Sequence, residues 1–241
     1  LEVRKYVGVP LEKQQRWATV DEAVEQWRQA FVEVGVFVFK DAFHVDDYFG
    51  FCLYDDEFPI IYVNNSSPKS RQVFTLFHEL GHLLFHTSGI DVSNDDRFHY
   101  RSKDARAVEI RCNAFAAEFL IPDRAFRAAL KGLPANRETA TSIAEQFKVS
   151  REVVYRRMLE LGLVAQPEYE DAATTWAQQA RGGGSGGNYY FTQFAYLGRP
   201  YIDLALGQYK RQRIDDIQLA EYLNIKPKSV PAFEEWYERT G

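Results

Sequence analysis

The sequence predicts an α+β fold, in which a small antiparallel sheet packs on helices and one helix carries an H-E-x-x-H motif. Two observations predict this class. Short runs of β-branched and aromatic residues, separated by turn formers, occupy residues 32–63 and are typical of strands. Helix-forming segments follow, and the later ones have helix-turn-helix character. Strands followed by helices are typical of α+β domains.

The amino-terminal elements follow from local patterns. Residues 20–29 are amphipathic and predict a helix. Three short strands are then expected, because residues 32–39 alternate Val and Phe, residues 48–54 are rich in aromatic side chains, and residues 60–63 are β-branched. With the helices that come next, these elements are assigned to a first domain, residues 1–130.

The H-E-x-x-H motif occupies residues 78–82, within an apolar segment, residues 71–87, that holds no proline. On an α-helix, residues four apart differ by only about 40° in direction, so His78 and His82 can aim two imidazoles at one metal ion. Glu79 lies about 100° round from His78 and can reach a water on that ion. This is the pattern of a metallopeptidase with Glu79 as the catalytic base. The alternative is a buried helix with two structural histidines, which leaves the buried glutamate unexplained.

A catalytic zinc site usually has three protein ligands, so a third ligand is required. The metzincin extension of the motif is absent. Glu109 is the best candidate, because on a helix it shares one face with Asn113 and with Ala116 and Ala117, whose small side chains favour close packing on the motif helix. Asn113 would then orient one of the metal ligands without binding the metal itself. The alternatives are Glu118, which points to the opposite face, and three residues of the intervening polar stretch, Asp95, Asp96 and His99.

The chemistry of this donor set indicates the metal. Zn²⁺ fits two histidines and a glutamate best, and Mn²⁺ is the alternative ion. A donor for the oxyanion of peptide hydrolysis is also needed, and the candidates are His99, Tyr100 and His86. His86 follows His82 by one turn, but ligands at three successive turns of one straight helix cannot converge on one ion. His86 is therefore not expected to bind the metal.

Residues 131–165 predict a helical module with helix-turn-helix character. A turn is expected near Lys148 and Val149, and Ser150 can cap the helix that follows. Three arginines would lie on that second helix, namely Arg151, Arg156 and Arg157. Contact with DNA is one interpretation of such a pair. Packing against the first domain is the preferred interpretation, because helices appended to a peptidase more often serve that role.

The last part of the chain predicts a linker and a second domain. Residues 166–188 are expected to form a flexible linker, because residues 182–187 are glycines with one serine. A helical domain is expected over residues 189–241. Within it, residues 220–230 loosely repeat the earlier helix-turn-helix spacing, with Asn224 at the turn. Its lysines and arginines are compatible with a protein partner, with nucleic acid or with a solvated surface.

Composition limits the class of protein. The 241 residues, 46% of them hydrophobic, can bury a core in more than one domain. No apolar run approaches the roughly 18–20 residues of a membrane span, and no secretory signal precedes the fold. Cys52 and Cys112 are too few for a secreted disulfide scaffold. A cytoplasmic protein without a membrane partner is therefore expected. The net charge of −5 argues against nucleic-acid binding by the whole chain.

Two segments carry a resemblance to a known family. They are residues 71–86, around the motif, and residues 113–122, which read Asn-Ala-Phe-Ala-Ala-Glu-Phe-Leu-Ile-Pro. Residues 50–51 and 58–64 extend the match upstream. The chain thus resembles the ImmA/IrrE family of bacterial and phage metallopeptidases over its first two thirds.

The resemblance implies a gluzincin-like zinc site, with His78, His82 and Glu109 as ligands and Glu79 as the base. It also implies a substrate, because such proteins cleave, or are needed to cleave, a partner transcriptional repressor and so release stress, phage or mobile-element genes. The predicted function is therefore that of a zinc-dependent endopeptidase acting on a DNA-binding repressor or another regulator. Other relatives occur beside toxin–antitoxin genes. The alternative is accordingly a non-catalytic, antitoxin-like binding protein with a structural metal site.

Overall fold

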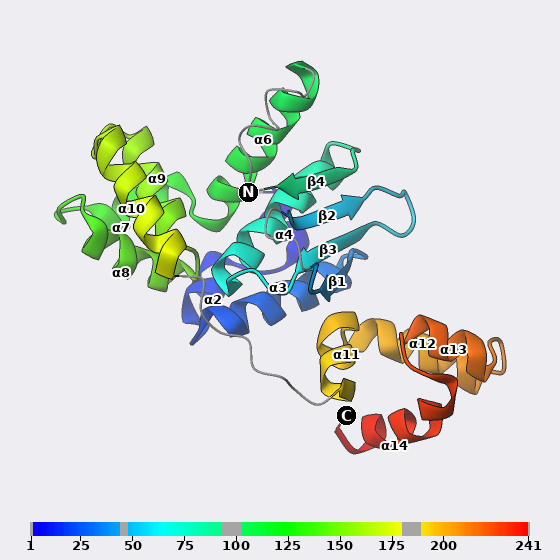
Figure 1. Cartoon of the computed structure of the whole chain (residues 1–241). Helices are drawn as coiled ribbons and strands as arrows, with labels where there is room; N and C mark the ends of the chain where they lie inside the picture. The colour runs from blue at the N-terminus through cyan, green and yellow to red at the C-terminus, as the bar shows by residue number, and fades with distance from the viewer. Residues whose placement is uncertain (1, 44–47, 93–102, 180–188, 241) are drawn as a thin grey trace. The chain divides into compact units, whose positions relative to one another are not determined.

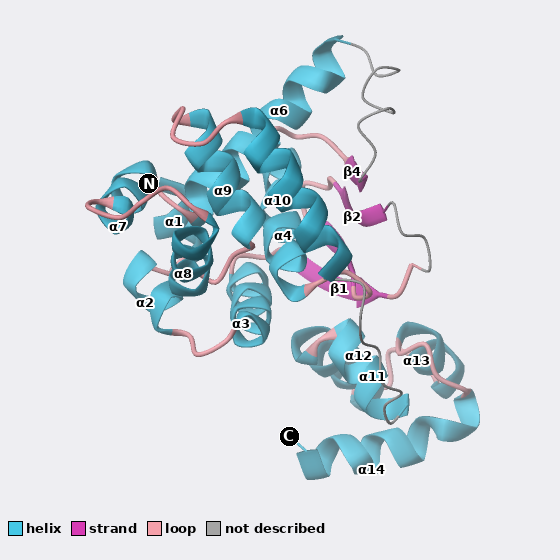
Figure 2. Ribbon diagram, turned by 60° about the vertical axis from the view of Figure 1, so that its left-hand side comes forward, coloured by secondary structure: helices cyan, strands magenta, loops and turns pink. Residues whose placement is uncertain are grey.

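The predicted α+β class is confirmed by a computed structural model, in which helices dominate and one small sheet lies among them (Figures 1 and 2). The chain divides into a larger unit, residues 1–37 and 41–184, and a smaller unit, residues 38–40 and 185–241. Among the residues described, no helix combines the length and the apolar composition needed to cross a membrane. The structure describes residues 2–43, 48–92, 103–179 and 189–240.

In the chain up to residue 179, three helices come first, three strands follow, and the other helices come after them, with one further strand behind α4. These elements are α1 (Glu2–Val7), α2 (Leu11–Arg16), α3 (Val20–Glu33), β1 (Phe37–Asp41), β2 (Tyr48–Leu53), β3 (Ile60–Asn64), α4 (Lys69–Leu84), β4 (Gly89–Val92), α6 (Lys103–Leu120), α7 (Asp123–Leu130), α8 (Arg137–Phe147), α9 (Arg151–Glu160) and α10 (Gln166–Gln179). The motif helix is α4, which packs on β2, β3 and β4 and also contacts α3 and α6.

The sheet is mixed, so the expectation of a purely antiparallel sheet is wrong. Its strand order is β1-β3-β2-β4, and β2 pairs antiparallel with β3 and with β4. β1 runs parallel to β3, because the Phe37 N–H donates to the Pro59 carbonyl (3.1 Å) and the Asn65 N–H donates to the Asp41 carbonyl (2.8 Å). Alternation along a strand is the same whichever neighbour the strand has. Sequence patterns therefore predict the strands but not their order.

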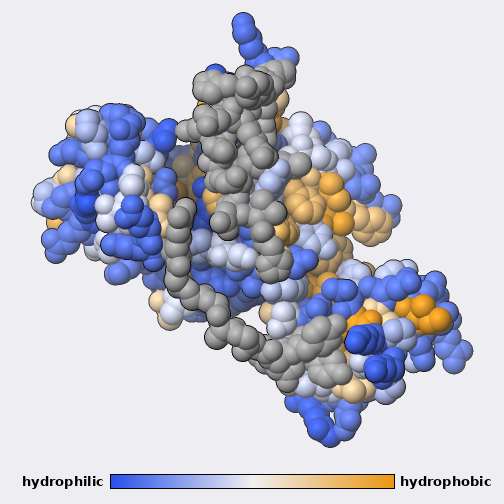
Figure 3. Space-filling view, viewed as in Figure 1, coloured by the Kyte–Doolittle hydropathy of each residue, from blue (hydrophilic) through white to orange (hydrophobic). Residues whose placement is uncertain are grey.

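Strand β4 was not expected from the sequence. It follows α4 closely and pairs with β2, with Gly89 opposite Cys52. This pairing places an edge of the sheet beside the motif helix (Figure 1). Hydrophobic residues also gather on the molecular surface in the region of the sheet (Figure 3), where Leu53 and Phe58 are exposed.

An aromatic cluster holds α3, α4 and α6 together. Trp27 and Phe31 from α3 meet the Phe77 ring of α4 edge to face, at centroid distances of 4.7 and 5.2 Å. Phe77 also stacks on Phe119 of α6 at 4.3 Å. Aromatic pairs in these geometries add to the stability gained by burying the rings. The cluster fixes one end of α6 against the helix that carries the motif.

The close approach of α4 and α6 depends on a glycine. A Cβ atom added at Gly81 would lie 3.2 Å from the Cα of Cys112. Such a contact is tighter than ordinary packing, so the absence of a side chain lets the two helices come together. Gly81 lies within the motif itself, and this packing brings α6 alongside the motif histidines.

The α8–α9 pair has the predicted turn. Lys148 adopts a left-handed conformation with φ of 57°, and the Val149 N–H donates to the Ala144 carbonyl at 3.1 Å. The Ser150 hydroxyl accepts a hydrogen bond from the Val153 N–H and caps α9. These contacts confirm the turn and the cap that the sequence indicated. The pair itself belongs to the larger unit.

Helix α10 corrects the expectation that a flexible linker begins at residue 166, because residues 166–179 form a helix. This helix packs on α9 and engages two of its arginines. The Arg151 guanidinium lies 5.0 Å from the Trp176 ring centroid, and that of Arg156 lies 5.5 Å from the Tyr169 ring centroid. The glycine-rich residues 182–187 lie outside the described residues.

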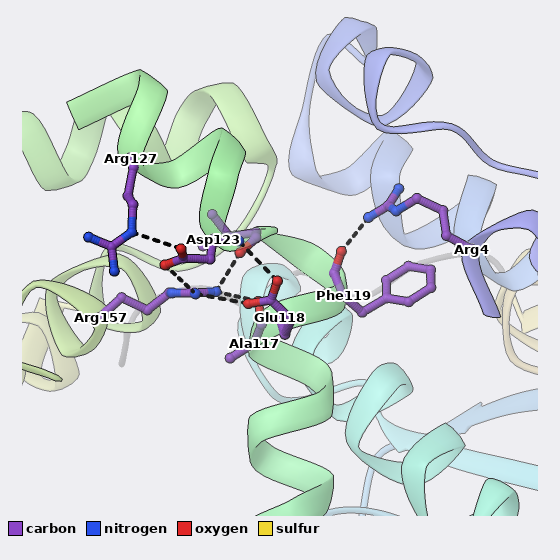
Figure 4. Close-up of polar contacts among 8 residues, drawn as sticks. Arg4, Ala117, Glu118, Phe119, Asp123, Arg127 and Arg157 are labelled. Carbon is purple, nitrogen blue, oxygen red and sulfur yellow. Dashed lines mark hydrogen bonds and ion pairs between the residues drawn. The ribbon is translucent and has the colours of Figure 1, made fainter. Parts of the chain in front are cut away.

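The third arginine of α9 holds the carboxyl-terminal end of α6 (Figure 4). Arg157 donates to the carbonyls of Ala117, at 3.2 Å, and Ile121, and it pairs with Glu118 at 3.0 Å. The last carbonyls of a helix lack partners within the helix, so these bonds complete the end of α6. From the other side, Arg4 donates to the Phe119 carbonyl (Figure 4). All three α9 arginines thus contact other parts of the chain, which supports the packing interpretation.

The carboxyl-terminal part of the smaller unit, residues 189–240, is helical and has its own core. Its elements are α11 (Tyr189–Leu197), α12 (Arg199–Lys210), α13 (Asp216–Tyr222), the 3₁₀ helix η1 (Pro227–Ser229) and α14 (Val230–Thr240). Asn224 is left-handed with φ of 51°, and the Ile225 N–H donates to the Ala220 carbonyl at 2.9 Å. The same bond occurs between Val149 and Ala144, so the loose repeat seen in the sequence corresponds to a repeated turn.

Candidate metal centre

Helix α4 carries three buried polar side chains of the motif. His78 and His82 are each only 2% exposed, and Glu79 is fully buried. The two histidines are one helical turn apart, and their Nε2 atoms lie 3.2 Å from each other. The spacing of the motif therefore produces the pair of converging imidazoles that the sequence predicted.

Helix α6 adds a carboxylate to this pair. The Glu109 Oε2 atom lies 3.2 Å from His78 Nε2 and 3.6 Å from His82 Nε2. Glu109 reaches the histidines because Cys112, one turn further along α6, packs on Gly81 of α4. Among the described residues, His78, His82 and Glu109 form the group whose donor atoms all lie within 4.8 Å of one another.

The far nitrogen of each histidine is held by a neutral oxygen. His78 Nδ1 lies 2.9 Å from Asn113 Oδ1, and His82 Nδ1 lies 3.2 Å from Thr87 Oγ1. The Thr87 hydroxyl donates to the His82 carbonyl, so it accepts from the imidazole. Since an amide oxygen also only accepts, both Nδ1 atoms carry the proton and both Nε2 atoms present a lone pair to Glu109.

The three donors fit a tetrahedral metal ion. For zinc–nitrogen distances of about 2.0–2.1 Å, a tetrahedron separates neighbouring ligand atoms by about 3.3 Å. The separations observed are 3.2, 3.2 and 3.6 Å. Two imidazole lone pairs and a carboxylate facing one another in a buried site repel unless a cation lies between them. A tetrahedral ion such as Zn²⁺ would fit this donor set, and His78, His82 and Glu109 would hold it.

Electrostatics favour an ionised carboxylate at this point. Burial by itself raises the pKa of Glu109. The neighbouring imidazoles of His78 and His82 outweigh burial and hold the Glu109 pKa well below the usual range of a carboxyl group. A metal ligand must be deprotonated, so the histidines prepare Glu109 for that role.

Two of the remaining residues considered from the sequence, His86 and Glu118, lie away from the three donors. His86 is exposed, and its Nδ1 atom lies 2.5 Å from the hydroxyl of Tyr54 on the β2–β3 connection. Glu118 pairs with Arg157 and does not join the three donors. The candidates Asp95, Asp96, His99 and Tyr100 lie outside the described residues.

Thr87 was missed in the sequence. It comes five residues after His82, in the turn that ends α4, and no periodic pattern marks it. His86 adopts a left-handed conformation with φ of 55°, which turns the chain so that the Thr87 N–H donates to the His82 carbonyl at 2.9 Å. A threonine directly after a helix that carries a histidine pair is the signal that could have indicated it.

Replacing Gly89 with Ala is expected to weaken zinc binding about 10- to 100-fold, although Gly89 is not a ligand. A Cβ atom at this position would lie 2.5 Å from Cδ2 and 2.8 Å from Nε2 of His82, so the imidazole must move. Changes that disturb the orientation of a ligand typically cost this much affinity. Competition with a chromophoric chelator measures the zinc Kd. Gly207→Ala is the matched control, because no atom lies within 4 Å of the added Cβ. An unchanged Kd in Gly89→Ala would contradict the prediction.

Comparison with known proteins places the site within the domain of a known protein family. The family model Peptidase_M78, the IrrE N-terminal-like domain, matches residues 32–159, which include the sheet and helices α4 and α6. A solved structure of a Mycobacterium tuberculosis transcriptional regulator is similar, with 20% sequence identity and a TM-score of 0.39. The similarity covers 65% of this chain and 50% of the regulator, so the chain spans half the length of that protein. No curated protein matches the chain.

Proposed function

Because the chain belongs to the Peptidase_M78 family, whose IrrE N-terminal-like domain matches residues 32–159, we propose that it is a zinc-dependent endopeptidase. The observation that carries this proposal is the convergence of His78, His82 and Glu109, with Glu79 buried beside them on the same helix. A structural metal site needs ligands alone and would give Glu79 no role. Burying a carboxylate next to them costs stability, and a chemical role explains why the chain carries one there.

In the proposed reaction, His78, His82 and Glu109 hold the metal and Glu79 acts as general base and then as general acid. A zinc ion bound there supplies a Lewis acid, which polarises the scissile carbonyl and lowers the pKa of water to about 7. Glu79 accepts a proton from the attacking water and delivers it to the leaving amine, so that the peptide bond is hydrolysed to a carboxylate and an amine. Asn113 and Thr87 hold the two imidazoles in the tautomer that keeps their Nε2 atoms available.

The proposed substrate is a specific partner protein, namely a DNA-binding repressor or another regulator of stress, phage or mobile-element genes. The resemblance of residues 71–86 and 113–122 to ImmA/IrrE peptidases supports this substrate class. A repressor substrate implies that the reaction takes place in the cytoplasm. Zn²⁺ is the proposed metal, and Mn²⁺ is the alternative that the same donors accept less well.

The test is cleavage of the regulator encoded beside this gene. We expect the zinc-loaded chain to cut this regulator at one or a few positions, to lose activity in a strong chelator and to regain it with added Zn²⁺. Mass spectrometry of the fragments identifies the bond that is cut. Stoichiometric binding of zinc without any cleavage would overturn the proposal of a peptidase. It would favour the alternative, a regulatory binding protein with a structural metal site.

A further inference from the structure

The turn between α4 and β4, residues 85–88, holds the ring of His82 through Thr87. The Thr87 hydroxyl oxygen accepts a hydrogen bond from His82 Nδ1 at 3.2 Å. The Thr87 N–H and the Thr87 hydroxyl both donate to the His82 carbonyl, at 2.9 and 3.1 Å. A displacement of Thr87 would therefore change the orientation of the His82 imidazole.

The same turn is held by Tyr54, which lies directly after β2. The Tyr54 hydroxyl lies 2.5 Å from His86 Nδ1, and the two rings meet edge to face with their centroids 4.9 Å apart. The Tyr54 N–H donates to the Ser88 hydroxyl at 3.0 Å. A single residue of the β2–β3 connection thus contacts both sequence neighbours of Thr87.

The direction of these hydrogen bonds follows from a carboxylate beside Tyr54. The Tyr54 hydroxyl donates its proton to Asp56, and this bond raises the pKa of Tyr54. A carboxylate only accepts, and the hydroxyl has one proton to give. In the contact with His86, the Nδ1–H group of His86 is therefore the donor and the Tyr54 oxygen is the acceptor. Asp56 and His86 together fix the hydroxyl of Tyr54 from two sides.

The backbone of the turn requires such support. His86 adopts a left-handed conformation with φ of 55°. This conformation crowds the Cβ atom against the following carbonyl, so residues other than glycine keep it only where surrounding contacts compensate. The Tyr54 hydroxyl contacts the side chain of His86 itself. Its loss would loosen the residue that directs the chain into Thr87.

We propose that Tyr54 is a positioning residue for His82: through His86 and Ser88 it keeps Thr87 where the Thr87 hydroxyl fixes the imidazole. This inference concerns the metal centre of the proposed peptidase and rests on that proposed function. Tyr54 is not one of the three converging donors. The β2–β3 connection nevertheless contributes to metal affinity, because it holds the turn that orients one of the ligands.

Tyr54→Phe tests this role, because phenylalanine keeps the ring and removes the hydroxyl. We expect its zinc affinity, measured by competition with a chelator, to fall about three- to tenfold, since a residue that contacts a ligand directly is worth about 10- to 100-fold. Tyr209→Phe is the matched control. The Tyr209 hydroxyl also donates to an aspartate, Asp216, at 2.7 Å, but in the smaller unit. Wild-type affinity is expected there, and wild-type affinity in Tyr54→Phe would overturn the proposal.

A double substitution shows whether Tyr54 acts through Thr87. Thr87→Val removes the hydroxyl that holds His82 and keeps the shape of the side chain. If both substitutions act on the same contact, adding Tyr54→Phe to Thr87→Val should change the zinc Kd by less than about twofold, because coupled residues are not additive. Independent losses that add in full would show that Tyr54 affects the metal by another route, and the inference would fail.

Proton exchange in the metal-free chain tests the contact without zinc or substrate. We expect NMR to show a slowly exchanging Nδ1–H proton of His82, assigned by its loss in His82→Gln, and faster exchange of this proton in Tyr54→Phe. The Nδ1–H proton of His78 is the internal reference, because Asn113 holds it. Unchanged exchange at His82, or equal acceleration at both histidines, would contradict the proposal. If the wild type binds zinc but cleaves no regulator, the peptidase proposal fails, and these measurements still decide the role of Tyr54.

Discussion

Replacing Glu79 with Gln is expected to lower kcat/KM for cleavage of the partner regulator by about a thousandfold while zinc stays bound. Gln has the shape of Glu, so it fits the fully buried position without moving His78 or His82. It cannot accept a proton from water, and general acid–base catalysis typically contributes between about 10² and 10⁴ to the rate. The measurement combines fragment quantification by mass spectrometry with zinc analysis of the same protein samples.

Glu118→Gln is the matched control for this variant. Glu118 is a glutamate of α6 whose side chain is 57% exposed and pairs with Arg157, away from the three converging donors. Its substitution is expected to leave cleavage and zinc content at wild-type values. Cleavage by Glu79→Gln at the wild-type rate would show that Glu79 is not the base. It would leave the motif as a structural metal site.

Replacing Glu109 with Gln is expected to reduce zinc affinity more than about 100-fold, and with it any cleavage. The substitution removes the one negative charge among the three donors and leaves a neutral amide, which is a poor ligand for Zn²⁺. Substitution of a residue that only orients a ligand lowers metal affinity about 10- to 100-fold, so loss of a ligand itself should lower zinc affinity by more than that. Competition with a chelator at constant pH gives the zinc Kd.

Asn113→Ala provides a graded comparison on the same helix. Its amide oxygen holds His78 at 2.9 Å but does not face the metal position, so its loss should cost only about 10- to 100-fold in affinity. Equal zinc affinity in Glu109→Gln and the wild type would mean that the third ligand comes from another segment. The residues between β4 and α6, where Asp95, Asp96 and His99 were considered, would then be the place to look.

The α8–α9 pair illustrates how a correct local prediction leaves function open. The turn at Lys148 and the cap at Ser150 follow from local propensities, and the structure has both. A DNA-reading helix needs arginines that are free to reach phosphates and bases. The arginines of α9 instead contact Trp176, Tyr169 and the end of α6. Whether such a pair reads DNA or supports a neighbouring domain depends on what covers its second helix.

The sequence by itself determined the features that depend on neighbours within one turn of helix. The four-residue spacing of His78 and His82 makes their imidazoles converge wherever the helix is placed, and Glu79 follows from the same geometry. Glu109 could also be predicted as a ligand, because the small side chains on its face of the helix indicated close packing on α4. The strands of the sheet were likewise visible as local runs.

Only the tertiary structure decided the contacts that join distant segments. The parallel pairing of β1 with β3 and the support of His82 by Thr87 both depend on which surfaces meet. Backbone geometry constrains a residue's near neighbours through a few dihedral angles, whereas contacts across the chain are selected by packing, burial and the satisfaction of polar groups over the whole domain. The motif therefore specifies the two proposed histidine ligands and the proposed base, and the fold supplies the proposed third ligand and the groups that hold the histidines.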